Sequence, residues 1–261
     1  MKKFFTLFAV AAMAFAAQAG ELTVCEGLYY SNTNPICGLY ADTQGAMTQS
    51  IYPADMLAEM AGNKITSVKF YTLEHYYEVN GQQSYDETDY INFEGATFQL
   101  SLLEVDQAGY TEVVAVTGAT AVATCVPEYG DVEVEFILDE PFEYNGKNLL
   151  VQVECIETSG DWGQTYFFGD GFDESYVSYY MIPGAAEDGG DAMDISGYIP
   201  MATFMYEAGD PTAVSEINSD KAVAGVRYYN MAGQEMQQAN GLTIVVTTYT
   251  DGTTSAVKVM K

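Results

Sequence analysis

The sequence predicts an all-β protein, a jelly-roll-like antiparallel β-sandwich followed by a small C-terminal β-sandwich or hairpin domain. Three observations lead to this fold class. Several segments alternate apolar and polar residues, which places one face of a strand in a core and the other in water. Turn-forming pairs such as Asn80-Gly81 and Asn145-Gly146 separate these segments. Only one brief helix is expected, between Pro53 and Met60, because proline is favoured in the first helical turn.

The first 19 residues have the composition of a secretory signal peptide. Lys2 and Lys3 precede an apolar run from Phe4 to Ala17, and Ala17-Gln18-Ala19 offers small residues for cleavage. The run is shorter than the roughly 20 apolar residues that span a membrane, and no other apolar run is longer. We therefore expect residues 1–19 to be removed and the mature chain to contain no membrane span.

Residues 20–207 are expected to form the main sandwich. The clearest alternation sets Val132, Val134, Phe136 and Leu138 against acidic residues. Roughly eight short strands with no long helix favour two packed antiparallel sheets, and we favour a jelly roll over an immunoglobulin-like arrangement. The other strand candidates are Val68–Phe70, Phe98–Leu102, Tyr110–Thr117, Leu149–Cys155, Gln164–Phe168, Ser175–Ile182 and Ile199–Tyr206.

The last stretch, residues 225–261, is predicted to form a separate small β-domain after a linker at 208–224. Asn240-Gly241 and Asp251-Gly252 supply turn residues that tolerate positive φ. Charge supports the division, because residues 212–261 hold four basic and four acidic residues, whereas residues 20–211 hold three basic residues and 33 of the 37 acidic ones. The strand candidates are Val226–Tyr229, Leu242–Tyr249 and Ser255–Met260.

The C-terminal stretch GVRYYNMAGQEMQQANGLTIVVTTYTDGTTSAVKVMK resembles the C-terminal sorting domain of proteins exported by the type IX (Por) secretion system. The resemblance rests on the aromatic strand ending in YYNMAGQEM, the GLTIVV strand and the final Asp-Gly hairpin. The segments GNKITSVKFYT, TFQLSLLEVDQAGYTE and VEVEFILDEPFEYNGKNLLVQVE are similar to the jelly-roll modules of type IX-secreted surface and adhesin proteins. The two resemblances imply a secreted or outer cell-surface protein that binds or adheres, and they imply no catalytic residue.

The net charge of −28 limits the partners that the protein can bind. Nucleic acids and anionic membranes need cationic patches, so we expect neither to be a partner. Solubility outside the cell is the simplest explanation of the acidic surface. Calcium coordination is the alternative, because Ca²⁺ prefers oxygen ligands.

The four cysteines are candidates for disulfides, the default for an exported chain with an even number of cysteines. Cys25 with Cys37 would close a short N-terminal loop. Cys155 shares a face with Val153, so it is expected to point inward, within reach of Cys125. The alternative is that Cys125 and Cys155 are buried free thiols, since free cysteine behaves as a small hydrophobic residue.

Residues for catalysis are sparse. His75 is the single histidine, and we interpret it as an exposed residue at a strand end, because no nucleophile motif accompanies it. Pairs of carboxylates for glycoside hydrolysis occur too often among 37 acidic residues to be informative.

Residues 161–180, DWGQTYFFGDGFDESYVSYY, are the best candidate for a ligand site. Aromatic rings bury a large area at low entropic cost, so they suit a sugar face or a protein partner. The alternative is that these aromatics are ordinary core residues of strands. The candidate ligand-binding residues are Trp162, Tyr166, Tyr176 and Tyr179, and the candidate calcium ligands are Asp170, Asp173 and Glu174.

These observations favour a non-catalytic surface module that binds a glycan or an extracellular protein, with calcium as the one cofactor considered. The alternatives are a secreted hydrolase whose acidic residues act on polysaccharide or peptide, and a structural component of a surface layer.

Overall fold

The computed structural model of the 261-residue chain divides into two compact units, Met1–Pro211 and Thr212–Lys261. The division falls inside the segment 208–224, where a linker is predicted. The residues that the structure describes are 19–27, 29–36, 41–81, 90–160, 163, 165–172, 175–209, 223–230, 234–236, 238, 242–250 and 254–260.

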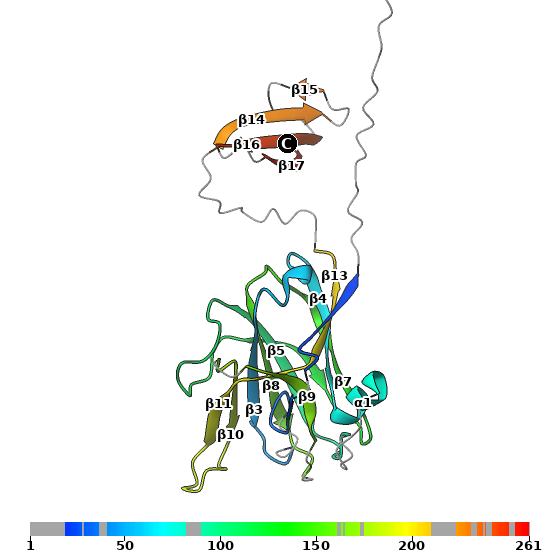
Figure 1. Ribbon diagram of the computed structural model, residues 1–261, viewed down its shortest axis with the longest axis vertical. Helices are drawn as coiled ribbons and strands as arrows, with labels where there is room; N and C mark the ends of the chain where they lie inside the picture. The colour runs from blue at the N-terminus through cyan, green and yellow to red at the C-terminus, as the bar shows by residue number, and fades with distance from the viewer. Residues whose placement is uncertain are drawn as a thin grey trace, which may run out of the picture. The chain divides into compact units, whose positions relative to one another are not determined.

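The first unit is built almost entirely from antiparallel strands in three sheets (Figure 1). The first sheet has the strand order β1 (Gly20–Val24), β13 (Ala202–Glu207), β4 (Lys64–Tyr71), β7 (Glu133–Glu143). The second sheet has the order β11 (Ala192–Ser196), β10 (Ser178–Ile182), β3 (Met47–Tyr52), β8 (Asn148–Glu157), β5 (Thr97–Val105), β6 (Thr120–Cys125). The third, smaller sheet has the order β12 (Tyr198–Pro200), β9 (Phe167–Gly171), β2 (Tyr29–Ser31).

Eight of these strands have the connectivity of a jelly roll. In chain order they are β1, β3, β4, β5, β6, β7, β8 and β13. If these eight strands are numbered from one to eight, the first sheet (β1, β13, β4, β7) has the order one, eight, three, six. The part of the second sheet formed by β3, β8, β5 and β6 has the order two, seven, four, five. The predicted all-β, jelly-roll-like sandwich is therefore confirmed. Strands β10 and β11 extend the second sheet beyond β3, and β9 to β12 are an insertion between β8 and β13.

The main core lies between the first and second sheets. Val134, Phe136 and Leu138 of β7 are buried in it, as their alternation predicts, whereas Glu135 between them is exposed. They pack in one cluster with Phe204 of β13 and with apolar residues of β5 and β8. Each Å² of apolar surface removed from water contributes about 25 cal/mol, so this cluster is the main source of stability in the unit.

A second apolar cluster lies on the other face of the six-stranded sheet, where the segment 106–119 covers it. The predicted strand at Tyr110–Thr117 is wrong, because this segment pairs with no strand. Fully buried Gln49 of β3 holds it instead: Oε1 accepts hydrogen bonds from the amide of Val116 and the hydroxyl of Tyr110, both at 2.9 Å. Nε2 of Gln49 donates to the carbonyl of Val116 at 2.7 Å and to Oε1 of Gln152 at 2.8 Å.

The helices differ from the predicted one. The expected helix at Pro53–Met60 is reduced to a 3-10 helix, η2 (Ala58–Met60), and the structure adds α1 (Leu73–Asn80), which was not predicted. His75 therefore lies on a helix, and its side chain is only 16% exposed, so its interpretation as an exposed strand residue is wrong. Within the described part of the chain, neither helix has the length and hydropathy to cross a membrane.

The second unit is a single four-stranded antiparallel sheet. Its strand order is β15 (Glu235–Met236), β14 (Val223–Asn230), β16 (Leu242–Tyr249), β17 (Thr254–Met260). Each of the three predicted strands of this region falls within one of these elements. The predicted turn residues Asn240-Gly241 and Asp251-Gly252 lie outside the described residues.

Candidate ligand-binding pocket

An open pocket of about 330 Å³ lies where the three-stranded sheet meets the β10–β11 hairpin. Its volume is at the lower end of the roughly 300–1,000 Å³ that is typical of small-molecule sites. It is lined by residues of β2, β9, β11, β12 and the adjoining connections: Tyr29, Gly171, Phe172, Ser175, Tyr176, Ser196, Gly197 and Tyr198.

Two glycines keep the walls of this pocket close together. A Cβ atom at Gly197 would lie 2.1 Å from the carbonyl oxygen of Phe172, whose amide donates a hydrogen bond to the carbonyl of Gly197 at 2.6 Å. A Cβ atom at Gly171 would lie 3.0 Å from the ring of Tyr29. A side chain at Gly197 would force the two backbones apart, whereas one at Gly171 would require only a small shift of the exposed Tyr29 ring, so the shape of the pocket depends chiefly on Gly197.

Two tyrosines at the pocket keep a large part of their surface exposed. Tyr29 is 54% exposed and Tyr176 is 57% exposed. The carbonyl of Tyr176 accepts a hydrogen bond from the amide of Tyr110 at 2.6 Å, which fixes its backbone. By contrast, Tyr198 donates its hydroxyl to the carbonyl of Phe167 at 2.7 Å, and burial raises its pKa well above the ordinary value. Tyr198 is thus a neutral part of the wall, whereas Tyr29 and Tyr176 offer exposed ring surface.

A row of polar side chains runs from the interior to the pocket wall. Nδ2 of Asn34 donates to Oγ of buried Ser178 at 3.4 Å, and this oxygen lies 2.9 Å from Oγ of Ser196, which lines the pocket. The amide of Tyr198 donates to the same Ser196 oxygen at 3.4 Å. The Ser196 hydroxyl is therefore held in place at the pocket surface, where it can exchange a further hydrogen bond with a ligand.

The structure brings one of the four predicted ligand-binding residues to this pocket. Tyr176 lines it. Tyr179 is only 3% exposed and belongs to the second apolar cluster, so for this residue the alternative interpretation, a core aromatic, holds. Tyr166 packs in a third cluster beside α1, with its ring centroid 5.5 Å from that of Tyr30. Trp162 lies outside the described residues.

Sequence reasoning missed Tyr29 because β2 has only three residues and lies in a stretch that carries irregular-loop signals. The Tyr29-Tyr30 pair becomes informative only once the contact of Tyr30 with Tyr166 is known. Neighbouring side chains of a strand point to opposite faces, so when Tyr30 packs on Tyr166, Tyr29 must point the other way. The pocket lies on that second face.

Asp170 of β9 is the one predicted calcium ligand that the structure describes, since Asp173 and Glu174 lie outside the described residues. Its Oδ1 accepts a hydrogen bond from the amide of Gly171 at 3.0 Å. Across the described ranges, no three His, Cys, Asp or Glu residues gather in a way that could hold a metal ion. Calcium binding at these residues stays a prediction.

The predicted disulfide between Cys125 and Cys155 is wrong. Cys125 of β6 and Cys155 of β8 both lie opposite Phe98 of β5, one on each side of that strand. Strands on either side of a third are about 10 Å apart, whereas a disulfide requires Cα atoms within about 7 Å. Both thiols are free, and Cys155 is buried in the core as predicted. Cys25 is also a free, buried thiol, so its predicted disulfide with Cys37, which itself lies outside the described residues, is wrong as well.

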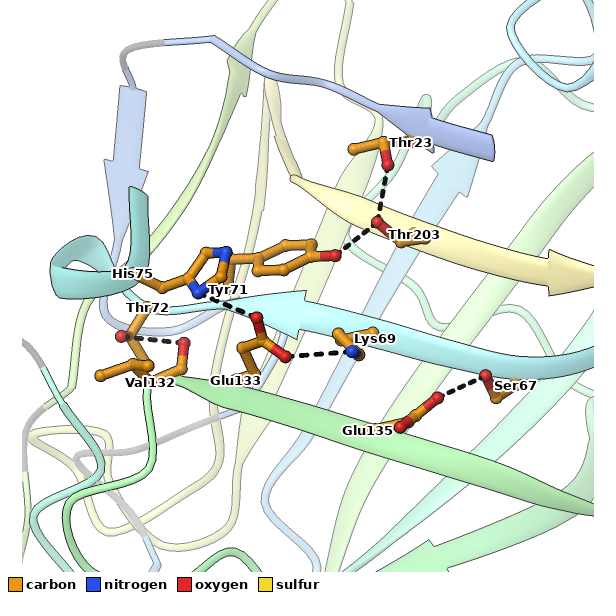
Figure 2. A network of polar contacts seen from close by, with 10 residues as sticks. All are labelled: Thr23, Ser67, Lys69, Tyr71, Thr72, His75, Val132, Glu133, Glu135 and Thr203. Carbon is orange, nitrogen blue, oxygen red and sulfur yellow. Dashed lines mark hydrogen bonds and ion pairs between the residues drawn. The ribbon is translucent and has the colours of Figure 1, made fainter. Parts of the chain in front are cut away.

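The single histidine belongs to a polar network on the outer face of the first sheet (Figure 2). Nδ1 of His75 lies 2.9 Å from Oε1 of Glu133 on β7, and Oε2 of the same carboxylate lies 3.0 Å from Nζ of Lys69 on β4. The imidazole centroid lies 4.6 Å from the ring of Tyr71, whose hydroxyl is 2.6 Å from Oγ1 of Thr203. The network fastens α1 to β4, β7 and β13.

Comparison with known proteins gives no match: no family model, no curated protein and no solved structure matches this chain. The interpretation of the pocket therefore depends on its own geometry and chemistry.

Proposed function

We propose that the protein is a non-catalytic binding module, secreted or displayed on the cell surface, that engages a glycan or an extracellular protein through the pocket of Tyr29 and Tyr176. The observation that carries this proposal is the pair of half-exposed tyrosine rings in one open pocket. Tyrosine is enriched at recognition sites because its rigid ring buries a large area while it loses little conformational entropy.

The position of the pocket in the fold also supports a binding function. The jelly roll has its own core, and the pocket is built from β2 and from the insertion β9–β12 outside the eight principal strands. Phe167 and Ile199 of this insertion pack in the main core, whereas exposed lining residues such as Tyr29 and Tyr176 can be adapted to a ligand without disturbing that packing.

The proposed location depends on the two ends of the chain. Residues 1–19 have the composition of a signal peptide, and the unit Thr212–Lys261 has a sequence that resembles a type IX sorting domain. We therefore propose export by the signal peptide and delivery to the surface under the direction of the C-terminal unit.

A binding array of glycans and extracellular-matrix proteins tests the binding function with the full chain and with Tyr29→Ala and Tyr176→Ala. We expect at least one ligand, and an affinity at least about ten-fold lower in each variant. Tyr129→Ala is the matched control, because Tyr129 is 56% exposed but lies outside the pocket, with its hydroxyl 3.2 Å from that of Tyr90. Binding that survives both pocket substitutions contradicts the proposal, and cleavage of an arrayed polysaccharide favours the hydrolase.

Export is tested in a bacterium that has a type IX secretion system. The full chain should reach the outer surface, whereas a chain truncated after Pro211 should remain in the periplasm. A strain that lacks the secretion system is the control, and it should retain both forms. Equal surface delivery of the full and truncated chains would overturn the sorting role of the C-terminal unit.

A further inference from the structure

We infer that the pocket of Tyr29 and Tyr176 takes an electrically neutral sugar ring and rejects sugars that carry a carboxylate or sulfate group. This inference depends on the proposed binding function and specifies the ligand class. It follows from the charge of the lining, the positions of the cations of the first unit and the chemistry of the exposed groups.

The pocket lining is uncharged in the part of the chain that the structure describes. The eight lining residues comprise four aromatic residues, two serines and two glycines. An ionised ligand group that leaves water needs an ionic partner or several charge-assisted hydrogen bonds to compensate for its lost hydration. These residues offer no cation, so a carboxylate or sulfate bound here would be left without an ionic partner.

The basic side chains of the described part of the first unit are engaged elsewhere. Between residues 20 and 211 the sequence contains three basic residues, all of them lysines, and none of them lines the pocket. Each lysine lies close to a carboxylate: Lys64 to Glu143 at 3.9 Å, Lys69 to Glu133 at 3.0 Å and Lys147 to Asp106 at 2.8 Å. A negatively charged ligand would therefore find no available lysine at this site.

One acidic residue flanks the pocket and strengthens the rejection of anions. Asp194 is exposed on β11, two residues before Ser196 and therefore on the same face of the strand. Because the whole chain carries a net charge of −28, the surrounding field repels anions and leaves a neutral sugar unaffected.

The exposed groups match a sugar in their chemistry. The face of a tyrosine ring is negatively polarised, so it attracts the C–H groups on the apolar face of a pyranose ring. Ser196 presents a hydroxyl that Ser178 and the Tyr198 amide hold in place, and Ser175 exposes a second hydroxyl. Each hydroxyl can both donate and accept, as the hydroxyls of a sugar can, so the polar groups of the two partners can be satisfied together.

Matched pairs of methyl glycosides test the inference: glucose with glucuronate, galactose with galacturonate, and mannose with mannuronate. The members of a pair differ only at C6, so a difference in affinity reports the effect of the charge. We expect isothermal titration of the full chain to detect the neutral member of at least one pair. The corresponding uronate should bind at least about ten-fold more weakly.

Two sets of variants separate ring contact from charge. Tyr29→Phe keeps the ring and should bind within about two-fold of the unchanged protein, whereas Tyr29→Ala should lose at least about ten-fold. Ser175→Lys adds a cation to the lining. At low salt it should reduce the ratio of the affinities for the neutral sugar and its uronate at least about three-fold. Thr124→Lys, at an exposed position of β6 outside the pocket, adds the same charge and should leave that ratio unchanged.

Three results would overturn the inference, and they bear differently on the proposed function. If a uronate or the cationic sugar glucosamine binds more tightly than the neutral sugar and Tyr29→Ala abolishes that binding, the site stands and the ligand class is wrong. If the sugars do not bind but an arrayed protein does, in a manner that Tyr29→Ala abolishes, the binding function stands without the neutral sugar. If no binding depends on Tyr29 or Tyr176, both proposals fail.

Discussion

The imidazole of His75 and the carboxylate of Glu133 form the contact that joins α1 to β7, with Nδ1 and Oε1 2.9 Å apart. At neutral pH the carboxylate is an acceptor only, so Nδ1 must be the protonated nitrogen of the neutral ring. Oε2 of Glu133 lies 3.0 Å from Nζ of Lys69, and this contact raises the pKa of the lysine. One carboxylate therefore bonds to groups on two elements.

The stability of the first unit should depend on the protonation of His75. Burial lowers the pKa of His75 below 6.5, and Lys69 lowers it further, against the opposing effects of Glu133 and Glu78. Well above pH 6.5 the ring is neutral in both the folded and the unfolded chain. As the pH falls below 6.5, the unfolded chain takes up the proton first, so the free energy of unfolding decreases until the pH has fallen through the folded-state pKa.

Urea unfolding of the full chain and of His75→Gln at pH 7.5, 6.5 and 5.5 checks this expectation. The free energy of unfolding of the unchanged protein should exceed that of His75→Gln by a smaller amount as the pH falls. The many carboxylates are common to both proteins and cancel in the difference. A difference that grows towards pH 5.5 would show that the charged pair with Glu133 outweighs burial, contrary to the expectation.

Gln49→Leu should lower the free energy of unfolding by about 2–3 kcal/mol. The substitution leaves the amide and carbonyl of Val116 and the hydroxyl of Tyr110 without their partner, and buried groups without a partner cost about 1–3 kcal/mol each before the segment relaxes. Denaturant unfolding and proteolysis within residues 106–119 measure the effect. The control is Gln44→Leu, because Gln44 is exposed and makes one hydrogen bond, to the carbonyl of Ile156. Equal losses in the two variants would contradict the role of Gln49.

Cys125 and Cys155 should both be alkylated when the protein is unfolded without a reductant, because they are free thiols on either side of β5. In the folded protein both should react slowly, since burial raises the pKa of each thiol to about 11 and the reactive thiolate is scarce. Peptide mass spectrometry after labelling in each state checks both expectations. A disulfide-linked peptide pair that contains Cys125 and Cys155 would show that β6 and β8 do not pair on opposite sides of β5 as the structure has them.

Gly197→Ala should destabilise the first unit by about 1–3 kcal/mol and weaken ligand binding at the pocket. Its Cβ atom would lie 2.1 Å from the carbonyl oxygen of Phe172, so the hydrogen-bonded backbones must separate. Thermal unfolding and the binding array provide the measurements. Gly190→Ala is the control, because its nearest contact is the side chain of Asp188 at 3.1 Å, and a change within about 0.5 kcal/mol is expected there. If Gly197→Ala left both the stability and the ligand binding unchanged, the pocket walls would be able to move apart at no cost.

The comparison of β7 with the segment 106–119 shows how far the sequence predicts the fold. In β7 the alternation of Val134, Phe136 and Leu138 with acidic residues is a local pattern, and the structure confirms it. Residues 110–117 are also rich in β-branched and small apolar side chains, yet they form no strand. They are held by Gln49, which precedes Tyr110 by 61 positions and Val116 by 67, and no local pattern signals these contacts.

The candidate pocket likewise combines one residue with a local sequence signal and one without. Tyr176 could be predicted because it lies in an aromatic-rich stretch, whereas Tyr29 could not, because its strand is three residues long and pairs with β9 about 140 positions away. Tyr179 was predicted as a ligand-binding residue from the same stretch, but it is buried. Its burial depends on the segment 106–119 covering the sheet, which is a long-range arrangement.

The sequence by itself determined that the first unit is an antiparallel β-sandwich, because the alternation of apolar and polar residues along a strand is a local pattern. It also determined that the charge of this unit differs sharply from that of the last 50 residues, because net charge is a property of composition. Only the tertiary structure decided which side chains meet. It placed Phe98 between Cys125 and Cys155, and it brought Tyr29 and Tyr176 into one pocket. Strand order and register set these contacts, and they result from long-range packing that the alternation of residues along one strand does not specify.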